Sequence, residues 1–369
     1  MNYRFDKIAF NSTVKKTPTE SDKEHYIGLE HIDSECLEIT RWGSDVAPIG
    51  EKLIMKKGDV LFGKRRAYQR KLAIAPFDGI FSAHGMVLRP NEEVVDKNYF
   101  PFFMSSDLFM ERAVQISVGG LSPTINWKDL REQEFPLPSL AKQKVLADKL
   151  WAAYRLKESY KKLLAATEEM VKSQFIEMFG GGNWPQKTLG EVGSFTRGGG
   201  FQKSDFVEHG IPCIHYGQIH TKFGPFITSH ITEISSDLES KTKFASKGDL
   251  VIAITSEDTE GSCKSTAWLG DYPVAVGGHA AIYKHSMNPL YMSFFFKSTL
   301  FNYAKIEYVH GTKVFEIKPD DIAKILVPCP PMSLQNQFSA IAEQSDKSGF
   351  ELRKSIDAID AVIKSLINS

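Results

Sequence analysis

The chain contains an internal duplication, which constrains its fold more than any other feature of the sequence. FFMSSDLF (102–109) returns as FFFKSTLF (294–301), with five of eight residues identical at an offset of 192. KKGDVLF (56–62) is matched by SKGDLVI (246–252), and PLPSLAKQ (136–143) by PPMSLQNQ (330–337) with two further residues of shift. Chance identity is only about one in twenty per position. This colinear series therefore predicts two similar domains built on one plan.

Each half is expected to have the same α+β plan. Short β-rich runs such as LVIAIT (250–255) precede an aromatic helix, a proline-containing exit and a long polar helix. At 369 residues the chain is long enough for two separate cores. The sequence predicts a mixed α/β domain at 1–138, a long helix with a glycine linker at 139–182, a second domain at 183–331 and a second long helix at 332–369.

The two long helices are expected to pair with one another. The first runs from about Leu140 to Phe179 and stops at the Gly180–Gly182 run. Because a 40-residue helix spans roughly 60 Å, we expect an antiparallel coiled coil that separates the domains and relates them by a pseudo-two-fold axis. The alternative is that each helix packs on its own domain. The apolar helix positions are Leu156, Tyr160, Leu163, Met170, Leu352, Ile356, Ile359 and Ile363.

A cluster of basic residues lies in GDVLFGKRRAYQRKLAIAP (58–76), between two apolar runs. It contains Lys64, Arg65, Arg66, Arg70 and Lys71. Because Lys and Arg equal Asp and Glu at 45 each, a nucleic-acid partner must be bound by local patches. The five cations have no acidic neighbours in the sequence and are predicted to contact DNA, together with Tyr68 and Gln69. The alternative is a solvated hairpin loop.

The matching segment of the second half, ITSEDTEGSCKSTAW (254–268), is acidic and rich in hydroxyl groups. Two domains with one scaffold and different loops are expected to contact different base sequences, because carboxylates accept from cytosine N4 and hydroxyls address several base edges. The glycines of RGGGFQK (197–203) allow a close approach of the backbone to a ligand, or simply flexibility. The remaining candidate DNA contacts are His84, Ser122, Gly199, Gln202, Lys203, Tyr216, Gln218, Ser256, Glu257, Lys264, His279, Thr312 and Lys313.

Five segments together resemble the specificity subunit of Type I restriction-modification systems. They are YIGLEHI (26–32), GDVLFGKRRAYQRKLA (58–73), GGLSPTINWKDLREQEFPLPSLAKQ (119–143), WPQKTLGEVGSFTRGGG (184–200) and the stretch from KGDLVIAIT (247–255) to VPCPPMSLQNQ (327–337). The first half departs from the pattern, because it lacks the WxxxxLGE-type lead that Trp184–Glu191 provides for the second.

The resemblance implies two target recognition domains, each reading one half of an asymmetric, bipartite sequence in double-stranded DNA. It also implies that the long helices separate these domains and dock methyltransferase subunits, here through the apolar helix positions named above. Restriction subunits can join such a complex. S-adenosylmethionine is expected on the methyltransferase partner, and no cofactor is expected on this chain.

The sequence lacks the motifs of an enzyme. No GxGxxG follows a predicted strand, no DPPY-like or NPPY-like tetrapeptide is present, and the four cysteines form no CxxC pair. Without HExxH or a Cys/His cluster, no metal site is expected. The alternative function is a DNA-acting hydrolase or nuclease in which the repeat-related His84 and His279 act as bases. No apolar run approaches the ~18 residues of a membrane span, and we expect a cytoplasmic protein.

Overall fold

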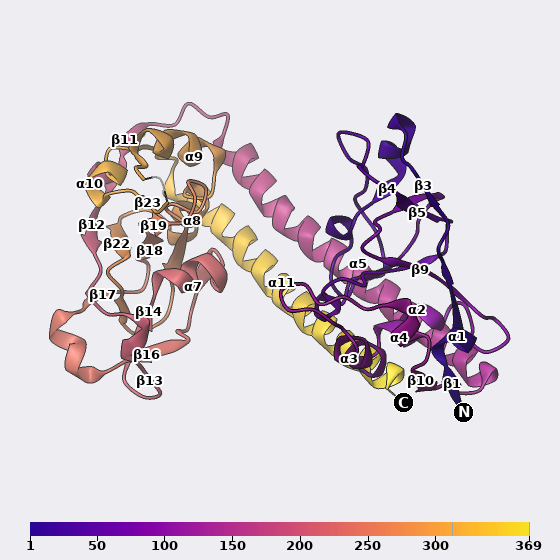
Figure 1. Ribbon diagram of the computed structural model, residues 1–369. Coiled ribbons are helices and arrows are strands. Elements are labelled where there is room, and N and C mark those ends of the chain that lie inside the picture. Colours follow the sequence, from indigo (N-terminus) through magenta and orange to yellow (C-terminus); the bar gives the residue numbers. More distant parts are fainter. Residues whose placement is uncertain (312, 369) are drawn as a thin grey trace. The chain divides into compact units, whose positions relative to one another are not determined.

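The computed structural model describes residues 1–311 and 313–368, which form two compact units (Figure 1). Unit 1 comprises Met1–Lys161 and the C-terminal segment that begins at Lys354, and unit 2 comprises Lys162–Arg353. Each unit therefore takes in part of both long helices, α5 (Leu140–Phe179) and α11 (Met332–Ile367). The domain boundaries predicted from the sequence place each long helix in a segment of its own. These boundaries stay a prediction.

Unit 1 is built on two four-stranded sheets. The first has the order β2 (Ala9–Ser12), β9 (Met86–Pro90), β6 (Val60–Phe62) and β7 (Leu72–Ile74). The second has the order β3 (Lys15–Lys16), β5 (Lys52–Met55), β8 (Gly79–Phe81) and β4 (Tyr26–Ile27). All pairs are antiparallel except β4–β8. The central strand β6 is buried throughout, as its continuous apolar run requires.

Unit 2 repeats this plan with longer sheets. One has the order β12 (Gly193–Arg197), β22 (Ala280–His285), β18 (Leu250–Ala253), β20 (Ser265–Trp268) and β15 (Phe226–Ile227). The other has the order β13 (Phe206–Val207), β16 (Thr232–Ile234), β14 (Ile211–Ile214), β21 (Val274–Val276) and β17 (Lys243–Ala245). The parallel pair β14–β21 corresponds to β4–β8 of unit 1. A short pair, β19 (Thr255–Ser256) and β23 (Phe315–Glu316), completes the unit.

The repeated aromatic segments fold as two helices in each unit. They are α2 (Phe100–Ser105) and α3 (Asp107–Gln115) in unit 1, and α8 (Pro289–Phe295) and α9 (Thr299–Lys305) in unit 2. Each break is a serine N-cap: Ser106 accepts from the Phe109 N–H, and Ser298 accepts from the Phe301 N–H. The single helix expected from the sequence is therefore interrupted at the same place in both halves. The phenylalanines of these helices pack in the core of each unit.

The first strand of each unit is anchored in the same way. β1 (Asn2–Arg4) pairs with β10 (Glu134–Pro136), and β11 (Gln186–Thr188) pairs with β24 (Leu326–Pro328). A one-turn helix follows each first strand: α1 (Phe5–Ile8) in unit 1 and α6 (Leu189–Val192) in unit 2. Unit 1 lacks the WxxxxLGE-type lead, but its first strand is anchored like that of unit 2. The reason is that backbone hydrogen bonds between paired strands provide the anchoring in both.

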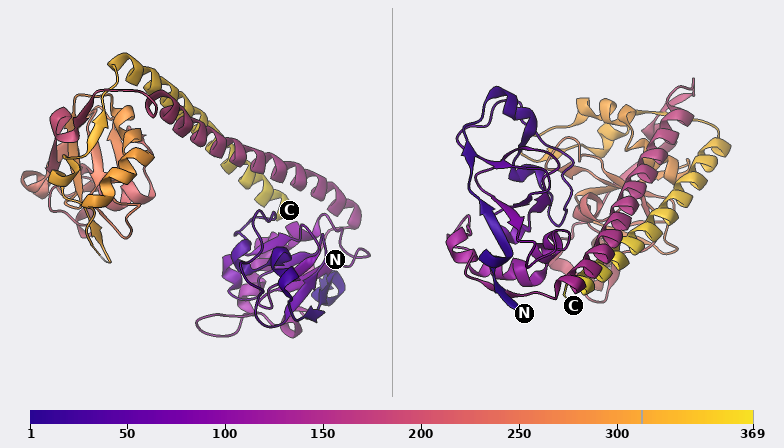
Figure 2. Two further views of the ribbon diagram at one scale, coloured as in Figure 1. Left: turned by 90° about the horizontal axis from the view of Figure 1, so that it is seen from above. Right: turned by 90° about the vertical axis from the view of Figure 1, so that its right-hand side faces the viewer.

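The long helices pair antiparallel within each unit (Figure 2). In unit 1 the Lys157 ammonium lies 2.5 Å from the Asp360 carboxylate. In unit 2 the rings of Phe175 and Phe338 meet edge to face at 5.2 Å between centroids. The predicted coiled-coil pairing is confirmed.

The remaining helical turns are α4 (Trp127–Leu130), α7 (Tyr216–Thr221), α10 (Pro319–Ile322) and the 3₁₀ turns η1 (Glu20–His25), η2 (Leu29–His31), η3 (Ala67–Gln69), η4 (Lys203–Asp205), η5 (Ser236–Lys241) and η6 (Ile306–Tyr308).

The alignment of PLPSLAKQ with PPMSLQNQ, which requires two further residues of shift, is wrong. Gln143 and Gln335, which are separated by the offset of 192, make equivalent hydrogen bonds to Asp96 and Asn288. Because side-chain geometry identifies these pairs, one offset holds from the aromatic helices into the long helices.

Candidate nucleic-acid interface

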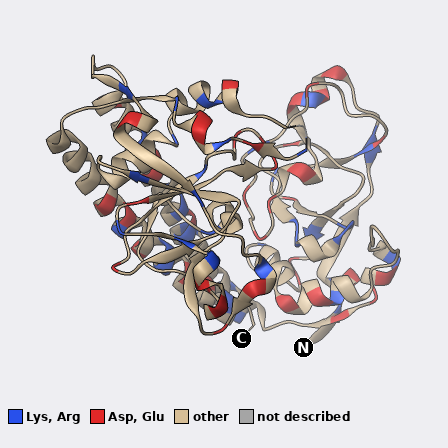
Figure 3. Cartoon of the chain, turned by 90° about the vertical axis from the view of Figure 1, so that its left-hand side faces the viewer, with Lys and Arg blue, Asp and Glu red and all other residues tan. Residues whose placement is uncertain are grey.

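Charged residues of both signs are interspersed over each unit (Figure 3). The candidate interface must therefore be found in local clusters, and the two units provide different ones. In unit 1 the cluster is the loop between β6 and β7. In unit 2 it is a hollow between α7, β19 and the loop that follows β19.

The β6–β7 loop is held in a defined shape by the segment that precedes α4. The Lys64 carbonyl accepts from the Ile125 N–H at 2.9 Å, and the Arg66 N–H donates to the Pro123 carbonyl at 2.7 Å. Arg66 and Arg70 flank the turn η3 in the left-handed region, with φ of 57° and 50°. This conformation costs roughly 1–2 kcal/mol for a residue other than glycine. The loop therefore carries local strain that the surrounding contacts maintain.

The outer side chains of this loop belong to three of the residues predicted to contact DNA. Arg65, Arg66 and Tyr68 are exposed, and Tyr68 keeps 55% of its surface accessible. The Arg66 Nε–H donates to the Ser122 hydroxyl at 3.2 Å, which brings together two candidates 56 residues apart. Lys64 is half-buried, and burial followed by the nearby charge of Lys15 lowers the pKa of its ammonium.

Two further cations of the cluster, Arg70 and Lys71, are bound by the protein itself. The Arg70 guanidinium lies 2.5 Å from the Asp107 carboxylate and 3.7 Å from that of Glu35. The Lys71 ammonium donates to the Leu29 carbonyl at 2.6 Å. The expectation that the cluster lacks acidic partners is therefore wrong for Arg70, because both carboxylates come from segments distant in sequence. Arg70 and Lys71 hold the loop, as does the Gln69 carbonyl, which accepts from the Ser34 hydroxyl.

The second cluster is a hollow of about 760 Å³ in unit 2, which we call the unit 2 groove. It is lined by seven of the residues predicted from the sequence: Lys203, Tyr216, Gln218, Ser256, Glu257, Lys264 and His279. They come from η4, α7, β19, the loop after β19 and the turn before β22. The structure thus brings into one site residues that lie up to 76 positions apart in the sequence.

Hydrogen bonds fix one of the groove residues in place, and two others present ring faces. The Gln218 Oε1 accepts from the His215 N–H at 2.9 Å, and its Nε2 donates to the Thr232 hydroxyl at 2.8 Å. Gln218 is buried and fixes the start of α7. Tyr216 packs its ring against His279, with centroids 5.1 Å apart. Aromatic and imidazole rings of this kind offer flat faces for base stacking.

Among the groove residues that sequence reasoning missed, His215 and Thr255 have the most distinctive environments. His215 accepts from the Gly217 N–H through Nδ1, and burial, then Lys203 and His279, lower the pKa of its imidazole. Thr255 is 7% exposed, and its hydroxyl has no hydrogen-bond partner within the described part of the chain. His215 adjoins Tyr216 in the sequence, which was a usable signal. Thr255 had none, because only the fold leaves its hydroxyl unpaired.

The other candidates lie outside the groove lining. Gly199 is structural: a Cβ there would lie 2.6 Å from the Lys241 carbonyl oxygen, so only glycine fits. Gln202 is exposed and donates its N–H to Asp205. Lys313 is exposed on the segment before β23, and Thr312 lies outside the described residues.

The histidine pair of the alternative function has no catalytic setting. His84 and His279 are both exposed, and neither ring forms a hydrogen bond or ion pair with any residue of 1–311 or 313–368. A general base requires such an orienting partner. Across the same residues, no three His, Cys, Asp or Glu side chains come together as a metal site. None of the helices in this part of the chain is long and apolar enough to span a bilayer.

Comparison with known proteins agrees with the geometry. The family model described as "Type I restriction modification DNA specificity domain" matches residues 10–168. The EcoDI specificity subunit of Escherichia coli is 24% identical over 184 residues, covering 48% of this chain and 41% of that protein. The MjaX specificity subunit of Methanocaldococcus jannaschii is 24% identical over 372 residues, covering 92% of this chain and 84% of that protein.

A solved structure shows the same fold. A chain from a study of complex assembly and conformational transition of the type I R-M system superposes with a TM-score of 0.57 at 18% identity. The superposition covers 100% of this chain and 96% of that one. The family model, the curated relatives and the fold all agree with the sequence resemblance. By these comparisons the chain is similar to the specificity subunits of Type I restriction-modification systems.

Proposed function

We propose that this chain is the DNA-reading subunit of a Type I restriction-modification complex, in which each unit reads one half of an asymmetric, bipartite target. One observation carries the proposal. Equivalent central strands, β6 and β18, lead into surfaces of different chemistry: exposed arginines in unit 1 and a groove lined by carboxylates, hydroxyls and lysines in unit 2. Two domains with the same scaffold and different surface side chains suit the recognition of two different half-sites.

The chemistry of each surface indicates how it would read DNA. The exposed guanidinium of Arg66 suits the O6 and N7 acceptors of guanine in the major groove. The Glu257 carboxylate in the unit 2 groove suits the N4 donor of cytosine. Lys203 at the groove wall supplies a positive charge for phosphate oxygens. None of these roles needs a bond-making step, so the chain would position partner enzymes and do no chemistry of its own.

The long helices offer a surface for those partners. Leu156, Leu163 and Met170 recur every seven residues on α5 and are 45%, 51% and 52% exposed. An exposed apolar stripe at this spacing suits docking against helices of another protein. The other docking candidates are half-buried: Tyr160, Leu352, Ile356, Ile359 and Ile363. Ile363 packs against the core of unit 1.

We assign the α5 stripe to methyltransferase subunits that carry S-adenosylmethionine, with restriction subunits joining the complex in the cytoplasm. In this arrangement the continuous helices set the number of unread base pairs between the half-sites. The helices then serve both for spacing and for docking.

Selection of bound sequences from random duplexes, with the chain assembled with its methyltransferase, tests the proposal. We expect enrichment of two short motifs at a constant separation. Arg66→Ala should relax only one motif and Glu257→Gln only the other, by about 1–3 kcal/mol per lost base contact. Arg131→Ala, a change of an exposed arginine beyond the end of α4, is the control. Failure to enrich any motif, or relaxation of both motifs by one substitution, would contradict the assignment.

A further inference from the structure

Unit 2 contains a second hollow, next to the groove, whose walls are basic. It has a volume of about 410 Å³ and is bounded by Lys172 on α5, the loop before β20, and the α8–α9 helices. We call it the basic recess. Its charged and polar lining includes Lys172, His220, Lys264, Ser265, Lys297 and Lys305. Four lysines around one hollow repel one another, and an anion bound among them would offset this repulsion.

The lysines of the recess are poorly neutralised by the protein. Lys264 and Lys297 form no ion pair with any described residue, and Lys172 only a solvent-exposed pair with Glu169 at 3.4 Å. Lys305 is 3% exposed and donates to the carbonyls of Glu260 and Ser262 at 2.9 and 2.6 Å. The one carboxylate in the lining is that of Glu260.

The electrostatics of Lys297 reflect this crowding of positive charge. Lys297 is exposed to solvent, but surrounding protein atoms displace part of the hydration shell of its ammonium. This desolvation, followed by the like charges of Lys264 and Lys172, lowers the pKa of Lys297 to about 8.

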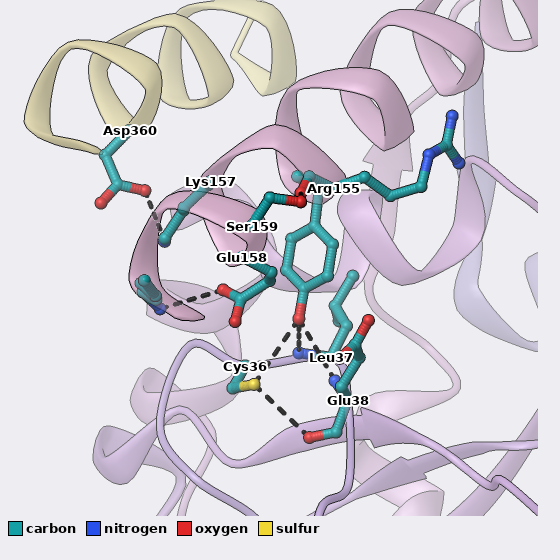
Figure 4. Close-up of polar contacts among 10 residues, drawn as sticks. Cys36, Leu37, Glu38, Arg155, Lys157, Glu158, Ser159 and Asp360 are labelled. Carbon is teal, nitrogen blue, oxygen red and sulfur yellow. Dashed lines mark hydrogen bonds and ion pairs between the residues drawn. The ribbon is translucent and has the colours of Figure 1, made fainter. Parts of the chain in front are cut away.

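The corresponding place in unit 1 shows how the same fold neutralises its cations. At the offset of 192, Lys364 matches Lys172 and Ser105 matches Lys297, and both unit 1 residues line a small hollow of about 90 Å³. There Arg70 is paired with Asp107. Lys157 is paired with Asp360 (Figure 4). Unit 2 has Thr299 in place of Asp107. At these matched positions unit 2 therefore has a threonine in place of a carboxylate and a lysine in place of a serine.

Two further observations point to a ligand in the recess. Ser265 is 3% exposed and lines the recess, yet its hydroxyl has no hydrogen-bond partner among the residues of 1–311 and 313–368. Buried hydroxyls without partners are rare in folded proteins. Lys264 and His220 line both the recess and the unit 2 groove, so the two hollows share a wall. The recess therefore adjoins the groove.

We propose that the basic recess of unit 2 binds a phosphate group of the DNA strand whose bases lie in the unit 2 groove. The proposal rests on the proposed function and adds a sequence-independent anchor that unit 1 lacks. Lys264, Lys297 and Lys172 surround the phosphate oxygens, and Lys305 holds the carbonyls of the loop that carries Lys264. A phosphate at this place neutralises charges that the protein leaves unpaired, and its binding releases the counterions of the duplex.

The test compares Lys297→Gln with Lys243→Gln in the complex assembled with the methyltransferase. Lys243 is an exposed lysine on β17 that does not line the recess. Affinity for duplex DNA is measured between 50 and 300 mM salt, on the selected target and on a scrambled duplex. One lost phosphate contact lowers the slope of log K against log salt by about 0.9, a roughly five- to tenfold loss at 0.1 M salt. We expect this loss on both duplexes for Lys297→Gln and no change for Lys243→Gln.

A labelling experiment on the unchanged chain removes any dependence on how a variant folds. Acetylation of each lysine is followed by mass spectrometry, with and without a duplex of the selected target. Protection of Lys297 and Lys264 relative to Lys243 supports the recess as a phosphate site. An unchanged salt slope for Lys297→Gln, or equal labelling of Lys297 with and without DNA, overturns it.

The outcomes also separate this inference from the proposed function. If the complex selects a bipartite target but Lys297→Gln behaves like Lys243→Gln, the recess inference fails and the DNA-reading function stands. If no sequence is selected while Lys297 is protected by any duplex and its removal lowers the slope, the reading function fails. The recess then stands as a non-specific DNA site.

Discussion

Gln143 and Gln335 make the same hydrogen bonds in the two units. The Asp96 N–H donates to Gln143 Oε1 at 2.8 Å, and the Asn288 N–H donates to Gln335 Oε1 at 2.9 Å. Each Nε2 donates to the carbonyl of a proline five residues earlier, at 2.9 and 2.8 Å. Both glutamines are buried, at 0% and 3% exposure. One buried amide thus fastens the beginning of each long helix to the globular part of its unit.

We predict that Gln143→Leu loosens this attachment in unit 1 alone. The substitution leaves the Asp96 N–H and two carbonyls without partners, which costs about 1–3 kcal/mol. Hydrogen exchange should therefore accelerate about tenfold or more at Asp96 and remain unchanged at Asn288, with the reverse for Gln335→Leu. Lys144→Ala, one residue along on the exposed side of α5, is the matched control. Uniform acceleration in both units would indicate global unfolding instead.

Arg66 allows the fold of the loop to be separated from its function. Its φ of 57° is strained for any residue with a Cβ, so Arg66→Gly should keep or raise the thermal unfolding temperature. Arg66→Val should lower it, because a β-branched residue fits the left-handed region poorly. Both variants should lose affinity for the same half-site. Loss of DNA binding by Arg66→Val alone would show that loop shape, and not the guanidinium, is read.

The lowered pKa of Lys297 predicts a specific dependence of stability on pH. Between about pH 8 and the ordinary lysine value of 10.5, the unfolded chain binds the proton that the folded chain has released. Stability therefore rises with pH through this window. Thermal unfolding of the chain and of Lys297→Gln, compared at pH 7.5 and 9.5, should show the variant relatively more stable at 7.5, with the difference shrinking at 9.5. A difference that is the same at both pH values would contradict the assignment.

The exposed stripe on α5 predicts which substitutions uncouple the chain from its partner. Leu163→Glu together with Met170→Glu should abolish co-purification with the methyltransferase, because charges on a desolvated helix face are costly to bury. DNA binding by the chain itself should persist. Ala165→Glu, an equally exposed position on the same helix but off the stripe, should leave co-purification intact. Retention of the methyltransferase by the double variant would remove the stripe from the docking surface.

The spacing role of the helices predicts a change in the DNA target. Deleting seven residues from both α5 and α11 shortens each helix by roughly 10 Å. This length corresponds to about three base pairs at 3.4 Å each. Sequence selection with the shortened chain should return the same two motifs with a shorter separation. An unchanged separation would show that another element sets it.

The sequence by itself determined the architecture of this protein. The duplication, the extent of the first long helix, the antiparallel helix pairing and the α+β class were all predicted correctly. These features depend on hydrophobic periodicity and repeated segments, which are local properties of a chain. The antiparallel pairing followed from helix length alone. The break of the aromatic helices at Ser106 and Ser298 was missed, because a serine becomes a helix cap only when the backbone around it turns.

The tertiary structure decided which polar residues share a surface and which are already occupied. Arg70 and Arg66 are alike in the sequence, but Asp107 comes from another segment and binds only Arg70. Lys297 and Lys305 were unremarkable within an aromatic repeat until folding placed them beside Lys172 and Lys264. Charge–charge interactions depend on distance in space, and a chain brings together residues that are far apart along it. The spacing of residues along the sequence therefore predicted the scaffold, and only the fold could reveal the basic recess.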